Sequence, residues 1–397
     1  MGRADSNSGV LSARAFSIQS CVGMLHQNKR VAREEGLKDL VAALEGFACV
    51  DDHRYEQALD RCFYFLQNGS AKEKGRKDAY RAIGLYALTV GRKAEQTLLD
   101  RLFHLGRLAT MVPSSPSDAE RAVAAIDCVA AATIATAKQP WEAERTLKAI
   151  WEVIQQTATA AIPQVLAAAV SAWTVVLPAA RYIEDDMTPF VLIAKLLRAD
   201  DDEKCLMAGG EALTVCIELD ILPRQPKYYW YNYYYSKTKP PEPEPDERPA
   251  LERRVSELAF GVNARKKKAH AGEIGLFQQI DDFLKKNEQQ LDGSLTKNKQ
   301  GPRESVIHGG CVVKVSRWAK LVQLNFLRYY IGAEGFYTHF RLNLPLFRDS
   351  LGLTWAPGGR AEKEDLPAHE EKQLRKHRDR HSKAVKRDLQ DKMQQYA

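Results

Sequence analysis

Apolar residues recur at steps of three and four along most of the first 300 residues. In the segment VAREEGLKDLVAALEGF, the apolar residues at such steps are Leu37, Leu40, Val41, Leu44 and Phe47. A second stripe follows Asp51 and Asp52 and comprises Tyr55, Leu59, Cys62, Phe63 and Leu66. Residues at this spacing share one face of an α-helix, so the two stripes predict a helical hairpin.

Signals that begin helices recur near residues 31, 70, 117, 163 and 201, at spacings of 39, 47, 46 and 38 residues. Two of them, Ser70 to Glu73 and Ser117 to Glu120, are capping boxes, in which the serine and the glutamate bond free N–H groups at the helix start. The others include Pro163, tolerated in a first turn, and Asp201-Asp202. This period is typical of armadillo and HEAT repeats, so the pattern predicts an all-α, armadillo/HEAT-like helical-repeat solenoid with a concave surface suited to a macromolecular partner.

Glycines mark special places in these helices. Gly91 is expected to end the helix that starts at Ser70, in the left-handed conformation. Gly84, Gly209 and Gly210 lie within helical pattern, where glycine costs about 1 kcal/mol relative to alanine. We therefore expect close helix packing at these three positions.

One uncharged stretch, Thr157 to Ala180, exceeds the ~20 residues that a membrane-spanning helix needs. It is rich in alanine, interrupted by Pro163 and Pro178, and without a second such segment in the chain. A buried central helix of the solenoid is the favoured interpretation.

The helical pattern is interrupted after residue 223. The segment Lys227 to Lys237 holds seven aromatic residues in eight positions: Tyr228, Tyr229, Trp230, Tyr231, Tyr233, Tyr234 and Tyr235. Pro240 to Pro249 then combines five prolines with four carboxylates, which favours an extended linker. Helical pattern resumes at Ala250 to Leu258 and around Phe277 to Leu284, and residues 289–302 are expected to form a loop.

A small helical module is predicted at the C-terminal end. Val312, Val313 and Val315 suggest a short extended segment. A helical stripe then runs to a stop at Gly332 and comprises Trp318, Leu321, Val322, Leu324, Leu327 and Ile331. A further turn carries Phe336 and Phe340, and Asn343 is expected to cap a last short helix, with Pro345 in its first turn and Phe347 and Leu351 facing inward.

These segments predict six regions. They are a flexible N-terminus (1–29), helical repeats (30–223), the aromatic run and linker (224–249), a helical segment that completes the repeat domain (250–300), a C-terminal domain (305–353) and a basic tail (354–397).

Charge and cysteine content add to this picture. The chain of 397 residues carries 58 Lys and Arg against 51 Asp and Glu, a net charge of +7. Its seven cysteines contain no C-x-x-C pair, which indicates reduced thiols in the cytosol or nucleus. The N-terminus shows no secretory signal, and the match of Met1 to Ser6 to the short myristoylation pattern is interpreted as chance.

The basic residues concentrate in two segments. Residues 372–387 hold eight Lys and Arg against one Asp: Lys372, Arg375, Lys376, Arg378, Arg380, Lys383, Lys386 and Arg387. Such a tail is either a disordered solubilising segment or one that orders on a phosphate backbone. The second cluster is Arg265, Lys266, Lys267 and Lys268, for which a solvated helix face ranks first and RNA contact second, with nuclear import a further alternative.

The aromatic run leaves alternatives open as well. Seven rings in eight positions cannot share one face of a helix or strand, so some rings are exposed to solvent unless another segment covers them. A clasp that packs the linker and C-terminal module on the array is the first interpretation, since packing is the commoner role of such rings. Base stacking beside Lys227 and Lys237 is the second.

The sequence contains few features that would indicate an enzyme. The sequence has no G-x-x-x-x-G-K-[ST] loop, G-x-S-x-G elbow or H-E-x-x-H motif. His308 with Cys311, and His377 with His381, supply too few ligands for a zinc site, which needs four. We therefore predict no enzyme activity, metal, cofactor or small-molecule substrate.

The sequence resembles the interferon-related developmental regulator family. The C-terminal signature that carries the resemblance includes Trp318, Leu327, Gly332, Gly335, His339, Leu342, Asn343, Leu346, Arg348 and Asp349, with Phe340 where the family usually has leucine. The segment LQNGSAKEKGRKDAYRAIGLYALTVG is also similar to the family's entry into its second helical pair. The resemblance covers most of residues 30–353.

The resemblance implies a non-catalytic armadillo-like protein that binds ribosomes and represses translation, or that acts in the nucleus as a transcriptional co-regulator. We expect ribosomal RNA as the first partner, bound by the two basic segments, and transcription or chromatin proteins as the alternative. The expected location is the cytoplasm, with nuclear residence as the second. No membrane association is expected.

Overall fold

A computed structural model describes the helical body and the C-terminal segment of the chain. The described residues are 18–47, 53–67, 73–91, 98–103, 116–160, 162–180, 189–197, 202–219, 221, 247–260, 271–289, 304–308, 311–343, 346–347 and 351.

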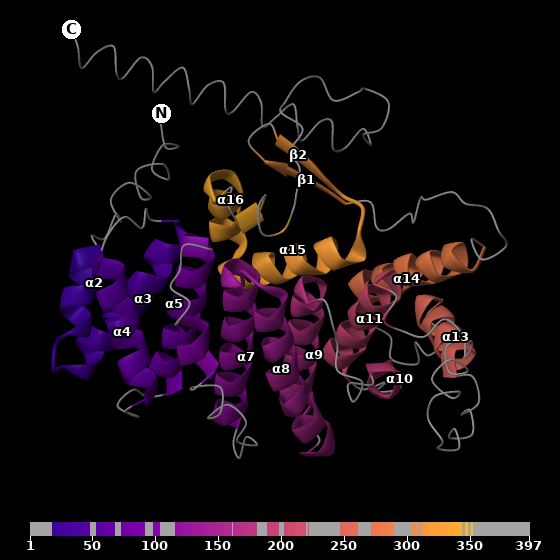
Figure 1. Ribbon diagram of the computed structural model, residues 1–397, viewed down its shortest axis with the longest axis horizontal. Helices are drawn as coiled ribbons and strands as arrows, with labels where there is room; N and C mark the ends of the chain where they lie inside the picture. The colour runs from indigo at the N-terminus through magenta and orange to yellow at the C-terminus, as the bar shows by residue number, and fades with distance from the viewer. Residues whose placement is uncertain are drawn as a thin grey trace, which may run out of the picture.

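Helices packed side by side form the body of the protein (Figure 1). The first helix row, in which each helix packs on the next, consists of α3 (Arg30–Glu45), α5 (Glu73–Val90), α7 (Pro116–Thr136), α9 (Pro163–Val176) and α11 (Glu203–Glu218). The second helix row packs behind it and includes α4 (His53–Gln67), the helical residues 98–103, α8 (Pro140–Ala160) and α10 (Pro189–Leu197). Helix α2 (Ile18–Leu25) covers one end, and α13 (Glu247–Ala259) and α14 (Ala271–Gln289) extend the other. These helices form an all-α helical-repeat solenoid, as predicted.

The predicted helix starts agree with the structure at several positions. Pro163 is the first residue of α9, and the Asp202 carboxylate accepts a hydrogen bond from Cys205 N at 2.9 Å at the start of α11. Gly91 follows the end of α5 with φ at +60°, the left-handed conformation expected of it. The uncharged stretch begins with the end of α8, at residues 157–160, and continues as α9, most of which is buried, and a short 3-10 turn, Leu177–Ala179, in which Leu177 is buried. Among the helices that are described, none is both long and apolar enough to cross a membrane.

Two predicted helix starts are shifted by one to three residues in the structure. Helix α7 begins at Pro116, so Ser117 lies in its first turn and is not the cap; the fixed φ of proline suits the first helical position. Helix α13 begins at Glu247, so the last three residues of the predicted extended linker are helical. Pro249 is compatible with this because first-turn N–H groups have no partner within the helix. The predicted cap at Ser70 lies outside the described residues.

The C-terminal segment begins with an antiparallel hairpin that the sequence analysis did not predict as a pair of strands. Strand β1 (Glu304–His308) pairs with β2 (Cys311–Val315), with Val306 opposite Val313. The predicted extended segment is therefore β2. Gly309-Gly310, between the strands in the sequence, is a dipeptide typical of two-residue hairpin turns and was the missed signal.

Helix α15 (Trp318–Ile331) lies across the first helix row, and α16 (Ala333–Leu342) follows it (Figure 1). The stripe predicted for α15 is buried, and Gly332, with φ at +89°, ends the helix as expected. Ten of the 14 residues of α15 are buried, more than one helical face can supply. Phe336, Phe340 and Phe347 pack against one another, with ring centroids 5.1–5.9 Å apart. This segment shares one continuous hydrophobic core with the helix rows.

Close packing explains the glycines within helices. An alanine methyl at Gly84 would lie 2.0 Å from Tyr330 Oη, so α15 approaches α5 only because this residue has no side chain. At Gly210, a methyl would lie 3.0 Å from Ile280 on α14. The glycine at position 84 thus allows contact with Tyr330, far away in the sequence. The hydrogen bond from Tyr330 Oη to Tyr80 O forms at the same contact between α15 and α5.

Candidate functional site

The predicted RNA-binding and aromatic residues lie outside the described residues, and their roles stay predictions. They are Arg265, Lys266, Lys267, Lys268, the tail residues from Lys372 to Arg387, and the aromatic run from Tyr228 to Tyr235. Of the C-terminal signature, Arg348 and Asp349 lie outside the described residues, and the other eight residues are described.

The described signature residues gather at the seam between the C-terminal segment and the first helix row. Helix ends leave carbonyl groups without an intrahelical partner. Polar side chains from the C-terminal segment donate to three such carbonyls: Gln323 to Val175 O at 3.1 Å, His339 to Leu44 O at 2.8 Å and Asn343 to Leu88 O at 2.7 Å. The three partners lie in the last turns of α9, α3 and α5, so one segment satisfies the ends of three helices.

The start of α15 is held by Glu218, at the end of α11. Its carboxylate accepts hydrogen bonds from Trp318 N at 3.0 Å and Ala319 N at 2.9 Å, and Arg317 Nε lies 3.7 Å away. A negative charge at a helix N-terminus interacts favourably with the helix dipole and with free N–H groups. Glu218 therefore fixes both the position and the direction of α15 on the array.

His339 is a structural residue of this seam. Its Nε2 donates to the Leu44 carbonyl, and its ring meets Phe47 edge to face with centroids 5.0 Å apart. Burial lowers the pKa of the imidazole, whereas the hydrogen bond to Leu44 opposes this shift. His339 is therefore neutral in the fold at physiological pH, which suits packing against an aromatic ring.

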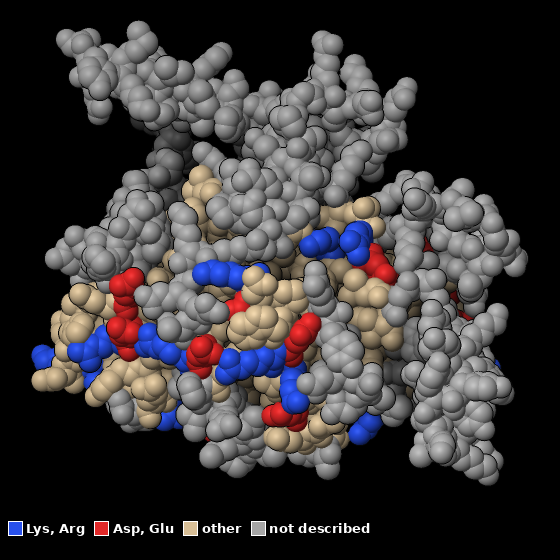
Figure 2. Space-filling view, viewed as in Figure 1, with Lys and Arg blue, Asp and Glu red and all other residues tan. Residues whose placement is uncertain are grey.

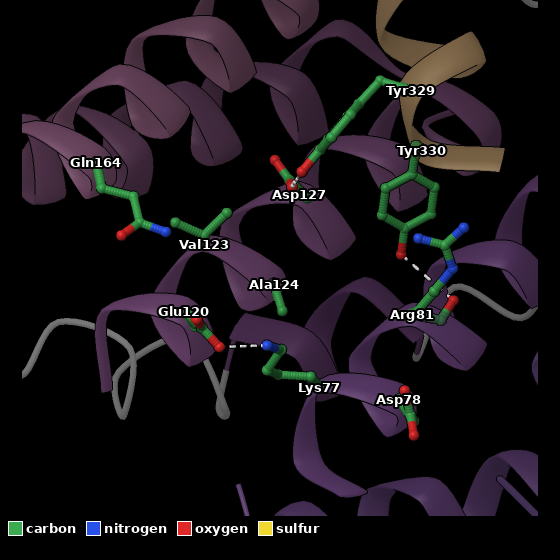
Figure 3. Close-up of a pocket in the computed structure, with 10 residues that line it drawn as sticks. All are labelled: Lys77, Asp78, Arg81, Glu120, Val123, Ala124, Asp127, Gln164, Tyr329 and Tyr330. Carbon is green, nitrogen blue, oxygen red and sulfur yellow. Dashed lines mark hydrogen bonds and ion pairs between the residues drawn. The ribbon is translucent and has the colours of Figure 1, made fainter. Parts of the chain in front are cut away.

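Beside the seam, the first helix row is hollowed (Figure 3). The hollow has a volume of about 370 Å³, within the range of ligand pockets. Its wall comes from α5, α7, α9 and α15 and is lined by Lys77, Asp78, Arg81, Glu120, Val123, Ala124, Asp127, Gln164, Tyr329 and Tyr330. The hollow joins segments that are about 250 residues apart in the sequence.

Asp127 is a buried acid in the wall of the hollow. Only 7% of the residue is exposed, and its carboxylate accepts a hydrogen bond from Tyr329 Oη at 3.2 Å. Burial raises the pKa of Asp127 to about 7, whereas the hydrogen bond and the charge of Arg81 hold it down. The Asp127 charge in turn raises the pKa of the Tyr329 phenol to about 12. Asp127 therefore changes charge near physiological pH.

The cations around Asp127 are engaged by other carboxylates. Arg81 donates to Glu45 Oε1 from both Nε, at 3.0 Å, and Nη2, at 2.6 Å, and Lys77 pairs with Glu120. The lining thus contains three carboxyl groups and two cations, and Glu45 adds a fourth carboxylate next to Arg81. When Asp127 is ionised, the hollow has an excess of negative charge.

Neither metal chemistry nor thiol chemistry is indicated in the described part of the chain. No group of three or more His, Cys, Asp or Glu side chains there is placed to hold a metal ion. Cys21, Cys62, Cys128, Cys205 and Cys216 are free and buried, and burial raises the pKa of the Cys62 thiol to about 12. A thiol with a raised pKa is a poor nucleophile.

The second helix row carries repeated contacts that the sequence analysis missed. Arg101 pairs with Asp60 at 2.8 Å and stacks its guanidinium 3.9 Å above the Phe63 ring. One repeat later, Arg145 pairs with Asp100 at 2.5 Å and lies 4.2 Å above the Phe103 ring. We call these two steps the arginine ladder. Its signal was present in the sequence, because D-R-x-F occurs at 60–63 and again at 100–103.

Charges of both signs are interspersed on the face that Figure 2 shows. Lys and Arg side chains alternate there with Asp and Glu and do not gather into a patch of one sign. Ion pairs such as Arg81 with Glu45 account for part of this mixing. The described side chains on this face therefore form no single basic surface.

Several residues of the hollow and the seam, or their contacts, were not predicted from the sequence. Asp127, Tyr329 and Glu218 belong to no local motif, and each acquires its partner only when α15 packs on the array. Trp318, His339 and Asn343 were singled out through the family resemblance, but their seam partners were not.

The array of α3, α5, α7, α9 and α11, with α15 packed across it, places the chain in the class of helical-repeat proteins. The family model for the interferon-related developmental regulator matches residues 4–271, so the chain belongs to the interferon-related developmental regulator family. The matched range covers the helix rows and ends before α15, so the equivalence of the C-terminal signature remains a prediction. No curated protein matches the chain significantly.

Proposed function

We propose that the protein is a non-catalytic regulator that binds the ribosome and represses translation. Membership of the interferon-related developmental regulator family supports a regulatory role. The helical-repeat scaffold is consistent with binding a macromolecule, since such arrays offer extended surfaces.

The observation that carries the RNA part of the proposal is the distribution of charge. Residues 372–387 hold eight cations and one carboxylate, an excess equal to the +7 of the entire chain. Lys and Arg neutralise phosphates and release counterions, which drives binding with little sequence preference. Arg265 to Lys268 would add a second contact. Cytoplasmic ribosomes are the expected target.

Sedimentation of the tagged protein in a sucrose gradient tests this proposal. The intact chain should migrate with ribosomes at low salt and leave them at raised salt. A variant in which the eight tail cations are changed to glutamine should stay near the top. In the matched control, Lys372, Lys376, Lys383 and Lys386 are changed to arginine, which keeps the charge and should preserve co-migration.

A second experiment links binding to translation. Adding the purified chain to a cell-free translation reaction should lower protein synthesis, and the glutamine variant should lower it less. If the intact chain remains at the top of the gradient at low salt, the ribosome proposal is wrong. A nuclear transcriptional co-regulator that acts as a protein scaffold would then be the function to test, by nuclear retention of the wild type and of a variant with Arg265 to Lys268 replaced.

A further inference from the structure

The hollow beside α15 contains an acid whose environment calls for a cation. Asp127 is a buried residue of the wall of the hollow, and the one hydrogen bond that its carboxylate receives from the described residues comes from the neutral phenol of Tyr329. A buried carboxylate is costly unless a cation or several hydrogen bonds compensate its charge.

The charged side chains that line the hollow with Asp127 come from two helices. Helix α5 contributes Lys77, Asp78 and Arg81, and α7 contributes Glu120. Lys77 pairs with Glu120, and Arg81 is held by Glu45 through two hydrogen bonds. Helix α9 contributes only the uncharged Gln164, and α15 the phenols of Tyr329 and Tyr330. No described side chain therefore makes an ion pair with Asp127.

The shape of the hollow suits one particular kind of group. A volume of about 370 Å³ accommodates a long side chain. Val123 and Ala124 provide apolar wall for an aliphatic stem, and the two tyrosines provide rings (Figure 3). Lysine and arginine bury their stems against apolar surface while the charged head finds a polar partner.

We propose that this hollow is a binding pocket for a lysine or arginine side chain presented by a basic segment of a partner protein, with the cationic head paired to Asp127. The lining holds three carboxyl groups against two cations, which favours a basic partner over a nucleic acid, whose phosphates these carboxylates would repel. The lining residues include none from the two basic segments proposed to contact RNA, so the proposal holds whether or not the protein binds ribosomes.

Proton release provides a specific signature of this pairing. Since burial raises the pKa of Asp127 to about 7, a cation that binds the ionised form must displace a proton below that pH. Affinity should therefore rise about tenfold per pH unit up to pH 7 and level off above it. An ordinary surface carboxylate, with a pKa near 4, would give no such dependence in this range.

Calorimetric titration of the purified full-length chain tests the pocket. The probe is the peptide acetyl-Gly-Arg-Gly-amide, and the control is the same peptide with citrulline, which keeps the shape of arginine without its charge. We expect the arginine peptide to bind with release of about half a proton at pH 7, measured in buffers of different ionisation enthalpy. The citrulline peptide should bind at least about tenfold more weakly.

Three variants locate the binding. Asp127→Asn keeps the shape and an acceptor for Tyr329 and should weaken arginine binding at least about tenfold and abolish its pH dependence. Asp60→Asn, which removes an exposed carboxylate on the second helix row, should bind as the wild type does. In the wild type, the hydrogen bond from Tyr329 lowers the pKa of Asp127. Tyr329→Phe removes this bond, so it should raise that pKa and move the midpoint of the pH dependence upward. Circular dichroism confirms that each variant is folded.

Three results would overturn the proposal. Equal binding of the arginine and citrulline peptides, or unchanged binding to Asp127→Asn, would show that the hollow does not select a cation. A large gain in affinity on truncation after Gly359 would assign the pocket to the chain's own basic tail and not to a partner. Unchanged affinity on truncation upholds a partner as the occupant.

Discussion

The two sides of the helical array are stabilised in contrasting ways. On the second helix row, the arginine ladder repeats one set of interactions, a guanidinium over a phenylalanine ring and beside an aspartate, with D-R-x-F spaced by about 40 residues. On the first helix row, the seam to α15 and α16 uses a different interaction at every helix. Glu218, Gln323, His339 and Asn343 each make contacts between residues at least 100 positions apart.

The difference concerns exposure as well as distance. The Arg101 side chain is 36% exposed, whereas His339 and Asn343 are at most 1% exposed. Exposed ion pairs contribute little to stability because water competes for the charges, while a buried polar group that loses its partner is costly. Each contact of the arginine ladder is thus expected to make a small and similar contribution to the free energy of unfolding, whereas each contact of the seam makes a large one.

The largest effect should follow loss of the Trp318 ring. This residue begins α15, is 1% exposed and meets Phe283 edge to face at 6.0 Å. Trp318→Ala should lower the free energy of unfolding by about 3–5 kcal/mol, because it leaves a cavity between α14 and α15. Chemical denaturation followed by circular dichroism measures the change.

A conservative variant sharpens this prediction. Trp318 Nε1 has no hydrogen-bond partner among the described residues, so Trp318→Phe loses no polar contact. It should cost about 1–2 kcal/mol, for the smaller ring alone. If Trp318→Ala is as stable as wild type, α15 does not contribute to the stability of the array and the contrast between the two sides is lost.

The second effect concerns the carboxylate at the start of α15. Glu218→Ala removes the acceptor of two buried N–H groups, those of Trp318 and Ala319, and should cost about 2–3 kcal/mol. Glu218→Gln keeps one oxygen acceptor and should cost about 1 kcal/mol, for the lost charge at the helix terminus. Denaturation midpoints compare the two variants. Equal losses of stability in the two variants would mean that the charge of Glu218, and not its hydrogen bonds, stabilises the start of α15.

The same contrast explains how much the sequence could predict. Helical stripes such as Leu37, Leu40 and Leu44, and the start signals at Pro163 and Asp202, act within one or two turns, and the structure confirms them. The contacts of the arginine ladder could also have been predicted, because the D-R-x-F motif is repeated in the sequence. Repetition makes such contacts visible because each step has the same chemistry at a fixed interval.

The seam could not be predicted in this way. Gly84 illustrates the difficulty: the sequence indicated close packing there but not that Tyr330 is the residue that approaches. Asp127 and Tyr329 are likewise ordinary residues on two helices until α15 crosses the array. Pairing them requires knowing which face α15 covers, and a single, unrepeated contact leaves no period in the sequence to reveal it.

The third effect is a pH dependence that belongs to the seam. The pKa of Asp127 is raised to about 7 in the fold, while an unfolded aspartic acid has one near 4. Between these values the folded state binds a proton that the unfolded state has released. The contribution of Asp127 to stability is therefore fully present below pH 4 and is lost as pH rises to 7, at up to about 1.4 kcal/mol per pH unit.

Thermal unfolding at pH 5, 6 and 7 of the wild type and Asp127→Asn isolates this contribution. The difference in stability between the two should shift in favour of the variant as pH rises. His339, whose pKa is lowered by burial, acts in the opposite direction: its contribution is present above pH 6.5 and is lost as pH falls. It is common to both proteins and cancels in the difference. A pH-independent difference would show that Asp127 is not perturbed in the fold.

The smallest effects should come from the arginine ladder. Arg101→Gln removes a partly exposed ion pair with Asp60 and the stacking on Phe63, and should cost about 1 kcal/mol. Arg101→Lys keeps the charge but loses the planar group that stacks on the ring, so it should recover less than half of that loss. High salt should reduce the ion-pair part and leave the stacking part.

The ladder also makes a prediction that the seam does not. Arg101 and Arg145 share no partner, since one contacts Asp60 and Phe63 and the other Asp100 and Phe103. The losses of Arg101→Gln and Arg145→Gln should therefore add to within about 0.5 kcal/mol in the double variant. At the seam, Trp318→Ala combined with Glu218→Ala should be far from additive, because both disturb the first turn of α15. A strongly non-additive ladder would mean that its steps are coupled along the array, and the distinction between many small local contacts and a few large distant ones would then fail.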